Sequence, residues 1–265
     1  MTRPHTVVIV GGGISGLATA FSLHEKATQA GLPIRCTILE SESSWGGKIV
    51  THRVGEMVTE AGPDSFLSQK QAGLDLCVKL GLADQLINTN ETGKKASVFY
   101  GGRLHDLPEG LLSFVPNQLG SFFRSGLLTW TGLARMGLEI AVPPGPSTGD
   151  ESLAAFLRRR FGVQAFERVL EPLMAGIYAG DAEHMSLRAT FSRFFELEQQ
   201  HGSIVRGMMA AKKAASLVST AQPRRTMFVS LKNGLSELVT ALTNRLTQQG
   251  VELRVGAQVE AIRVR

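Results

Sequence analysis

The chain has 265 residues, of which 43% are hydrophobic and 19% are charged, and its formal net charge is +5. This composition excludes intrinsic disorder, and a charge this modest gives no reason to expect nucleic-acid binding. The two cysteines, Cys36 and Cys77, lie far apart without metal-ligand spacing, so neither a disulfide framework nor a metal site is predicted.

No stretch of the sequence approaches the roughly 20 apolar residues that a membrane-spanning helix requires, and the N-terminus lacks the apolar region of a signal peptide. The sequence therefore predicts a cytoplasmic protein. The segment 111–142 is rich in Phe and Leu and contains Trp130. Such a segment fits peripheral contact with the cytoplasmic face of a membrane, and it equally fits burial inside a substrate domain.

The first elements in chain order form a strand–helix–strand unit. The β-branched run Thr6–Val10 predicts a buried strand, Ile14–Gln29 has helical spacing, and Ile34–Leu39 predicts a second strand. Such a unit needs a right-handed crossover between parallel strands. We therefore expect an α/β protein with a doubly wound, Rossmann-like domain.

Later in the chain the pattern changes twice. Residues 86–225 are punctuated by Gly and Pro and then become helical, with Thr148 and Glu151 spaced like a capping box. Residues 226–265 return to mixed structure, with strands expected at 227–231, 251–255 and 259–264 around a helical leucine stripe. We expect 1–85 and 226–265 to form one domain and 86–225 to form a helical domain inserted between them.

A glycine-rich motif connects the first strand to the first helix. Gly11, Gly13 and Gly16 match G-x-G-x-x-G in the strand–turn–helix context that gives the motif its meaning. The first glycine permits a tight turn, the second admits a pyrophosphate, and the third lets helix and strand pack closely. Glu40, at the end of the second strand, can accept hydrogen bonds from ribose hydroxyls, which favours FAD or NAD over NADP.

Two further glycine-containing clusters follow Glu40. Gly47 and Lys48 offer another close backbone approach and a cation for a phosphate, and a plain hairpin turn is the alternative. The residues Gly62, Pro63, Asp64 and Ser65 have turn chemistry and would by themselves indicate a loop.

Four segments then carry a resemblance to a known family. They are Val-Val-Ile-Val-Gly-Gly-Gly-Ile-Ser-Gly-Leu at 7–17, Leu-Glu-Ser at 39–41 with Gly-Gly-Lys at 46–48, Glu-Ala-Gly-Pro-Asp-Ser-Phe at 60–66, and Pro-Leu-Met-Ala-Gly-Ile-Tyr-Ala-Gly-Asp at 172–181. Together they resemble the flavin monoamine-oxidase superfamily and, within it, the FAD-dependent protoporphyrinogen and coproporphyrinogen oxidases of haem biosynthesis. The first segment is common among flavoproteins, whereas the last is specific.

The resemblance implies non-covalently bound FAD and assigns residues to it. The pyrophosphate would lie on Gly11, Gly12, Gly13, Ile14, Ser15 and Gly16, the ribose on Glu40 and Ser41, and the adenine on the backbone of Val259. Gly47 and Lys48 would lie along the cofactor, and Gly62, Pro63, Asp64 and Ser65 beside its isoalloxazine ring. Gly176 would belong to the wall of the substrate cavity. Lys94 and Lys95, or Arg103, are the candidate partners for the substrate propionates.

The implied activity is oxygen-dependent, six-electron oxidation of coproporphyrinogen III or protoporphyrinogen IX to the porphyrin, with release of hydrogen peroxide. Ala96, preceded by Lys94 and Lys95, stands where many protoporphyrinogen oxidases have an arginine, which favours the coproporphyrinogen type. No catalytic side chain is assigned, because the cofactor carries the chemistry. Another flavin amine oxidase or desaturase is the alternative enzyme. Because family members are longer, we expect a fragment with a truncated second FAD-binding part, and a catalytically incompetent FAD domain is the remaining alternative.

Overall fold

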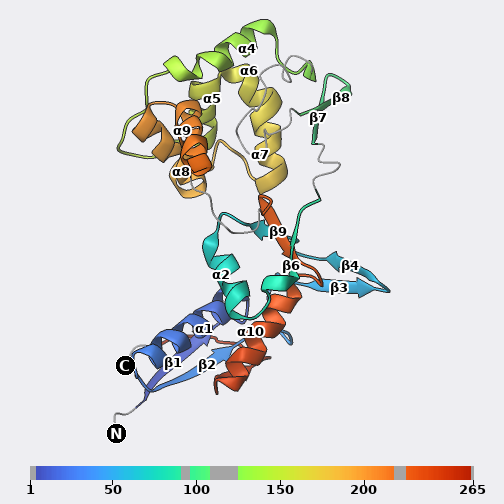
Figure 1. Cartoon of the computed structure of the whole chain (residues 1–265), viewed down its shortest axis with the longest axis vertical. Coiled ribbons are helices and arrows are strands. Elements are labelled where there is room, and N and C mark those ends of the chain that lie inside the picture. Colours follow the sequence, from blue (N-terminus) through green and yellow to red (C-terminus); the bar gives the residue numbers. More distant parts are fainter. Residues whose placement is uncertain (1–3, 91–95, 108–124, 218–224, 264–265) are drawn as a thin grey trace. The chain divides into compact units, whose positions relative to one another are not determined.

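The computed structural model describes residues 4–90, 96–107, 125–217 and 225–263. The chain forms two compact units, one made of residues 1–90 with 223–265 and the other of residues 91–222. The first unit is α/β, and the second is mostly helical (Figure 1).

A parallel sheet carries the first unit. It contains β1 (His5–Val10), β2 (Ile34–Leu39) and β10 (Glu252–Arg254), in the order β1-β2-β10. His5 is paired with Ile34 and Val10 with Leu39, in parallel, so the expected neighbouring strands are confirmed. Because β10 comes from the end of the chain, the first and last blocks of sequence share one sheet.

Two helices cover this sheet and supply most of the core. Both α1 (Ile14–Gln29) and α10 (Ser236–Gln248) bury an apolar stripe, because their apolar residues recur at helical spacing. The buried members of this core are Leu17, Ala20, Phe21, Cys36, Ile38, Cys77, Leu231, Leu235, Leu238, Val239, Leu242, Leu246 and Val251. Both cysteines are therefore buried and free, and burial raises the pKa of each thiol.

Antiparallel strands complete the first unit. The strands β3 (Thr51–Val54) and β4 (Met57–Glu60) form a hairpin. A second sheet has the order β5-β9-β6, from Phe66–Leu67, Phe228–Leu231 and Leu86–Asn88. In the sequence, the helix α2 (Gln71–Lys79) and the short turn η1 (Ala83–Gln85) connect β5 to β6. The strand expected at 259–264 is wrong, because residues 259–263 form no strand and 264 lies outside the described residues.

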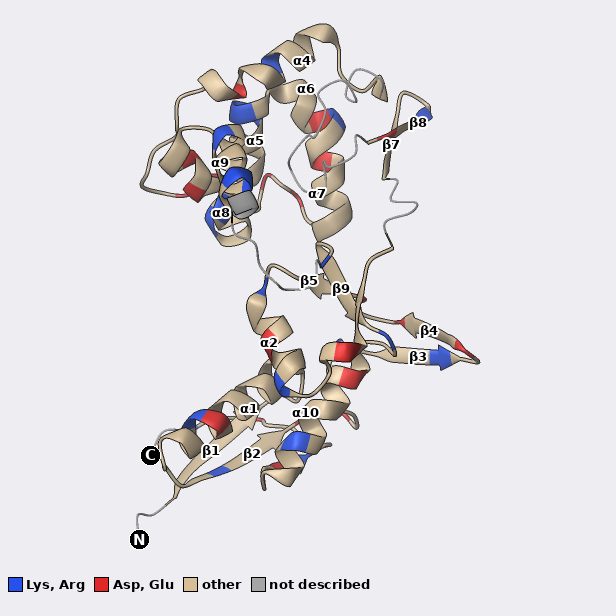
Figure 2. Cartoon of the chain, in the orientation of Figure 1, with Lys and Arg blue, Asp and Glu red and all other residues tan. Residues whose placement is uncertain are grey.

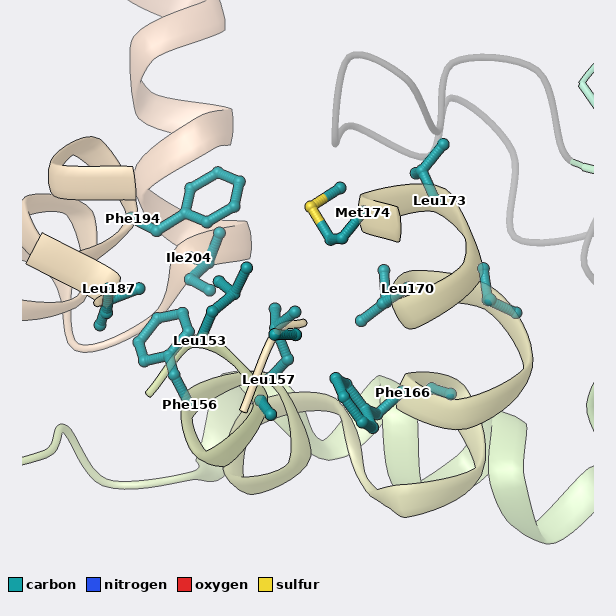
Figure 3. Packing of buried hydrophobic residues seen from close by; sticks show 14 of the residues in the cluster. Leu153, Phe156, Leu157, Phe166, Leu170, Leu173, Met174, Leu187, Phe194 and Ile204 are labelled. Carbon is teal, nitrogen blue, oxygen red and sulfur yellow. The ribbon is translucent and has the colours of Figure 1, made fainter. Parts of the chain in front are cut away.

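Helices dominate the second unit, with a single described hairpin of β7 (Ser97–Tyr100) and β8 (Arg103–Asp106). The remaining elements are α4 (Trp130–Gly137), η3 (Leu138–Ala141), α5 (Leu153–Phe161), α6 (Val163–Ala165), the π-helical turn η4 (Phe166–Leu170), α7 (Glu171–Tyr178), α8 (Leu187–His201) and α9 (Ile204–Leu217). Their apolar faces meet in a second core, in which Leu153 and Phe156 lie on the side of Ile204 and Phe194 (Figure 3).

The start of α5 differs from the sequence expectation. The expected capping box of Thr148 and Glu151 does not form, because Ser152 is the N-cap and its Oγ accepts a hydrogen bond from the N–H of Ala155 at 3.1 Å. Among the described residues, the structure contains no helix that is long and apolar enough to span a membrane.

A buried ionic cluster fixes the other end of α5, where basic residues gather (Figure 2). Arg160 is fully buried, and its Nε donates to Oε1 of Glu198 on α8 at 2.5 Å. The same guanidinium donates to the carbonyl oxygens of Val142 and Gly202, at 2.9 and 3.0 Å. A charge this deeply buried is tolerated because every one of these acceptors is in place.

Candidate functional site

The loop between β1 and α1 can be built only from glycines at two positions. Gly11 has a φ of +101°, a conformation that L side chains rarely adopt. A Cβ at Gly16 would lie 1.9 Å from the carbonyl oxygen of Gly11, so a side chain there would displace the turn. These are the tight turn and the close helix–strand packing that the motif predicted.

The N-terminus of α1 is open to an anion. Gly13 is the N-cap, no side chain caps the helix, and the first turn contains no acidic residue. A Cβ at Gly13 would meet no atom closer than 3.9 Å, so there is room beside the backbone. The free N–H groups and the positive end of the helix dipole fit the negative pyrophosphate of a dinucleotide.

Glu40 joins this loop to the end of β2. Its Oε2 accepts a hydrogen bond from the N–H of Gly12 at 2.6 Å, and its Oε1 accepts from the N–H of Glu42 at 2.9 Å and from Oγ of Ser41 at 3.1 Å. The backbone N–H groups of Glu42 and Gly12 lower the pKa of the Glu40 carboxyl below its ordinary value of 4.5. The carboxylate therefore remains ionised at neutral pH and retains a lone pair for a further donor, such as a ribose hydroxyl.

A cavity of about 400 Å³ lies at the carboxyl ends of β1 and β2. Its lining residues are Val10, Gly11, Leu39, Ser41, Glu42, Ala257, Gln258 and Val259. This is where open parallel sheets bind their ligands. The cavity and the uncapped end of α1 are thus both next to the loop that follows β1.

The segment after β10 forms one wall of this cavity. The N–H of Ala257 donates to the carbonyl oxygen of Glu40 at 2.7 Å, and that of Gly256 donates to Glu42 at 2.9 Å. Val259 thus lines the cavity, although in irregular backbone instead of the expected strand. Glu42, Ala257 and Gln258 were not singled out from the sequence, where only their proximity to Ser41 or Val259 could have marked them.

The second glycine cluster packs directly against the first. The N–H of Gly46 donates to the carbonyl oxygen of Gly12 at 3.0 Å, and Gly46 and Gly13 form an isolated β-bridge. The backbone of Gly47, with a φ of +59°, lies close to Gly13. Lys48 follows Gly47 directly, and its side chain is exposed.

The third cluster is connected to the second. The N–H of Ala61 donates to the carbonyl oxygen of Val50 at 2.8 Å, and a Cβ at Gly62 would lie 1.9 Å from the carbonyl oxygen of Lys48. Beyond it, Oγ of Ser230 donates to the carbonyl oxygen of Asp64 at 2.7 Å, which ties residues 62–65 to β9. Three glycine-containing segments, separate in sequence, therefore form one continuous backbone track within the first unit.

The second unit contains the residues expected to contact substrate. Gly176 lies near the end of α7, where residues 175–179 are all exposed, and a Cβ at Gly176 would meet no atom within 4 Å. Lys94 and Lys95 lie outside the described residues. Arg103 donates from Nε to Nε2 of the buried His105 at 3.2 Å, so its guanidinium is engaged within the unit.

Metal and triad chemistry find no support in the described part of the chain. It contains no group of three His, Cys, Asp or Glu side chains that could hold a metal ion. Nδ1 of His184 lies within hydrogen-bond distance of Oδ2 of Asp181, at 2.8 Å, and both side chains are exposed. The features that the structure does bring together are the three glycine-containing segments and the carboxylate of Glu40.

Comparison with known proteins identifies a family and several relatives of this chain. A family model described as flavin containing amine oxidoreductase matches residues 14–265. The protein of Bacillus subtilis (strain 168) named coproporphyrinogen III oxidase is 37% identical over 240 residues, which are 91% of this chain and 51% of that protein. The protein of Spinacia oleracea named protoporphyrinogen oxidase 1, chloroplastic, is 33% identical over 90% of this chain and 42% of that protein.

A solved structure gives the same result. The crystal structure of a "putative protoporphyrinogen oxidase" from Exiguobacterium sp. 255-15 has a TM-score of 0.74 and 33% sequence identity, covering 97% of this chain and 53% of that one. The chain thus spans about half the length of the curated and solved relatives that it matches.

Proposed function

Because the chain belongs to the family of flavin-containing amine oxidoreductases, we propose that it forms part of an oxygen-dependent porphyrinogen oxidase of haem biosynthesis. FAD is the cofactor that this family uses. The proposed reaction is the six-electron oxidation of coproporphyrinogen III, or of protoporphyrinogen IX, with molecular oxygen as acceptor and hydrogen peroxide as product. The observation that carries the proposal is the 30–37% identity, over most of the chain, to proteins named for these two activities.

The first unit would hold the cofactor. The open end of α1 and Lys48 would bind the pyrophosphate, and Glu40 and Ser41 would bind the ribose. Val259 would contact the adenine, and Gly62, Pro63, Asp64 and Ser65 would lie beside the isoalloxazine ring. Bound FAD supplies two-electron redox chemistry, so the work of this chain is to bind and orient the cofactor and to set the charge around it.

The second unit would hold the substrate. At the exposed end of α7, a Cβ at Gly176 would meet no atom within 4 Å, which leaves room for the puckered macrocycle of a porphyrinogen. Lys95 would bind a propionate of the substrate. Coproporphyrinogen carries four carboxylates and protoporphyrinogen only two, so a lysine pair at 94–95 favours the former.

The test uses the full-length gene product, purified and examined for flavin absorption. Incubation with coproporphyrinogen III, protoporphyrinogen IX and a panel of amines, with oxygen and hydrogen peroxide measured, separates the leading function from the amine-oxidase alternative. We expect porphyrin formation, with coproporphyrinogen preferred. A protein that takes up no FAD, or that oxidises amines and no porphyrinogen, would refute the proposal.

Substitution at Gly176 tests the substrate wall. Because a Cβ there meets nothing in the chain, Gly176→Phe should leave folding intact and obstruct only the ligand. We expect kcat/KM for the porphyrinogen to fall while flavin content stays unchanged. Unchanged kinetics would show that the wall lies elsewhere. In a parallel experiment, Lys95→Glu should raise KM with little change in kcat.

A further inference from the structure

One turn of the second unit has an unusual backbone conformation. Ala179, directly after α7, has a φ of +49° and is the only non-glycine residue with a positive φ in the described part of the chain. L residues avoid this region because the Cβ crowds the backbone, and helices that end this way normally do so with glycine. Such a conformation persists only when the surrounding structure enforces it.

The structure after the turn is firmly anchored. The carbonyl oxygen of Ala182 accepts a hydrogen bond from the N–H of Ala154 at 3.0 Å, and that of Met185 accepts one from the N–H of Leu153 at 2.8 Å. Ala182 is itself buried. The chain must therefore reach the first turn of α5 within a few residues of leaving α7, which forces the reversal at Ala179.

The structure before the turn is held by an aromatic contact. The ring of Tyr178 meets that of Phe191 edge-on at 5.2 Å, and Phe191 stacks on Phe194 at 5.2 Å. Phe191 lies at a kink of α8, with non-helical φ and ψ of −133° and 46°. Phe194 belongs to the buried core (Figure 3). The irregular backbone at Phe191 thus presents the ring that contacts Tyr178, the residue before Ala179.

Despite these anchors, the end of α7 has an unpacked surface. Ile177 and Tyr178 are 48% and 44% exposed, and residues 175–179 form an uninterrupted exposed stretch. A strained turn that carries exposed apolar residues contributes little to the core. Natural structures retain such strain mainly where it positions a functional surface.

We propose that Ala179 is a positioning residue, whose left-handed turn holds the exposed Gly176–Tyr178 surface in the conformation that receives the substrate macrocycle. This inference rests on the proposed function and extends it to a residue that does not itself react. The position needs a residue that tolerates positive φ: glycine would adopt it without the cost that the alanine methyl group incurs, whereas a β-branched residue would drive the turn out of the left-handed region. A turn displaced in this way would have to be restored when the substrate binds, which weakens binding.

The test compares two Ala→Gly substitutions in the full-length, FAD-loaded protein. Ala179→Gly should raise the melting temperature by about 2 °C, because it relieves the strained backbone. It should leave KM for the porphyrinogen within about two-fold of the wild type, because the left-handed turn is kept. Ala179→Val, whose branched side chain disfavours positive φ, should raise KM roughly five-fold with kcat within about two-fold of the wild type, because only the ordering of the binding surface is lost.

The matched control is Ala210→Gly on the exposed surface of α9. Glycine in a helix interior destabilises, so this substitution should lower the melting temperature by about 2 °C and leave KM unchanged. Ala179→Asn, which keeps a Cβ and tolerates the left-handed region, should restore KM toward the wild-type value.

Two results would overturn the inference. A KM for Ala179→Val within two-fold of the wild type would show that the turn positions nothing. A melting temperature that falls as far as that of Ala210→Gly would show that no strain is stored there. Failure of the wild-type protein to oxidise any porphyrinogen would instead overturn the proposed function together with this extension of it.

Discussion

The glycine loop at residues 11–16 and the Arg160 cluster differ in whether the chain itself supplies hydrogen-bond partners for their polar groups. In the loop, the N–H groups at the start of α1 have no side-chain cap. In the cluster, Arg160 has its acceptors supplied by Glu198, Val142 and Gly202.

This difference separates a binding site from a structural one. A site that is closed by its own partners has no capacity left for a ligand, whereas unsatisfied donors beside a cavity do. The contrast also explains why the run Arg158–Arg160, conspicuous in the sequence, is not a ligand site. Its middle and last members bind Glu151 and Glu198, and Arg158 binds Glu183.

The largest expected effect comes from opening the closed cluster. Arg160→Ala leaves the carboxylate of Glu198 buried with one partner fewer, and we expect a loss of about 3–5 kcal/mol in unfolding free energy. Arg158→Ala is the matched control, because its partner Glu183 is partly exposed, and it should cost less than about 1 kcal/mol. Urea denaturation measures both, and equal costs would contradict the distinction.

The next effect comes from filling the glycine loop. Gly16→Ala places a methyl group against the carbonyl oxygen of Gly11, so the loop must shift, at a cost of about 3 kcal/mol. FAD content, measured on the full-length protein, should fall to near zero. Gly137→Ala, at a position where a Cβ meets nothing, is the control and should retain full FAD content. Normal flavin content in Gly16→Ala would show that the loop at residues 11–16 is not part of the cofactor site.

A smaller effect is expected when the Glu40 carboxylate is made neutral. Glu40→Gln offers a single acceptor oxygen to three donors and turns an amide group toward one of them, which costs about 1–3 kcal/mol. The dissociation constant for FAD, followed by flavin fluorescence, should rise roughly ten-fold or more. Glu25→Gln, at a half-buried carboxylate of α1 that pairs with Lys79, should leave FAD affinity unchanged. A Glu40→Gln protein with wild-type affinity would contradict the assigned role.

The smallest effect is the acid dependence that the two regions share. Burial raises the pKa of Glu198, but Arg159 and Arg160 outweigh it and hold the pKa below 4.5, and that of Glu40 is also lowered. Their stabilisation is complete above about pH 4.5 and is lost as the pH falls through the folded-state values. Melting temperatures measured from about pH 7 to pH 3 should therefore decline less steeply in Glu198→Gln than in the wild type. Identical slopes would show that this carboxylate does not govern acid stability.

Much of the first unit could be predicted from local sequence. The strand–helix–strand unit lies where the pattern of β-branched and helical residues placed it, because its elements are amphipathic or fully apolar and its turns are marked by glycine. The roles of Gly11 and Gly16 could also be predicted from the sequence, since no other residue type fits at these two positions.

Other features depended on contacts between distant residues. Ser152 caps α5 in place of Thr148 because the β-bridge between Ser152 and Ser186 sets where the helix begins. Residues 256–259 form irregular backbone along the cavity wall, where the N–H groups of Gly256 and Ala257 donate to the carbonyl oxygens of Glu42 and Glu40. Local propensity contains neither piece of information.

The sequence by itself determined the βαβ unit, the glycine positions and the flavin family, because each depends on residue type at short spacing. Only the tertiary structure decided that three glycine segments form one track, that Arg160 is buried, and that Ala179 has a left-handed backbone. These features arise when segments far apart in the chain constrain one another. Alanine in particular has no local reason to turn left-handed, and it does so because the anchored residues on both sides leave the backbone no other path.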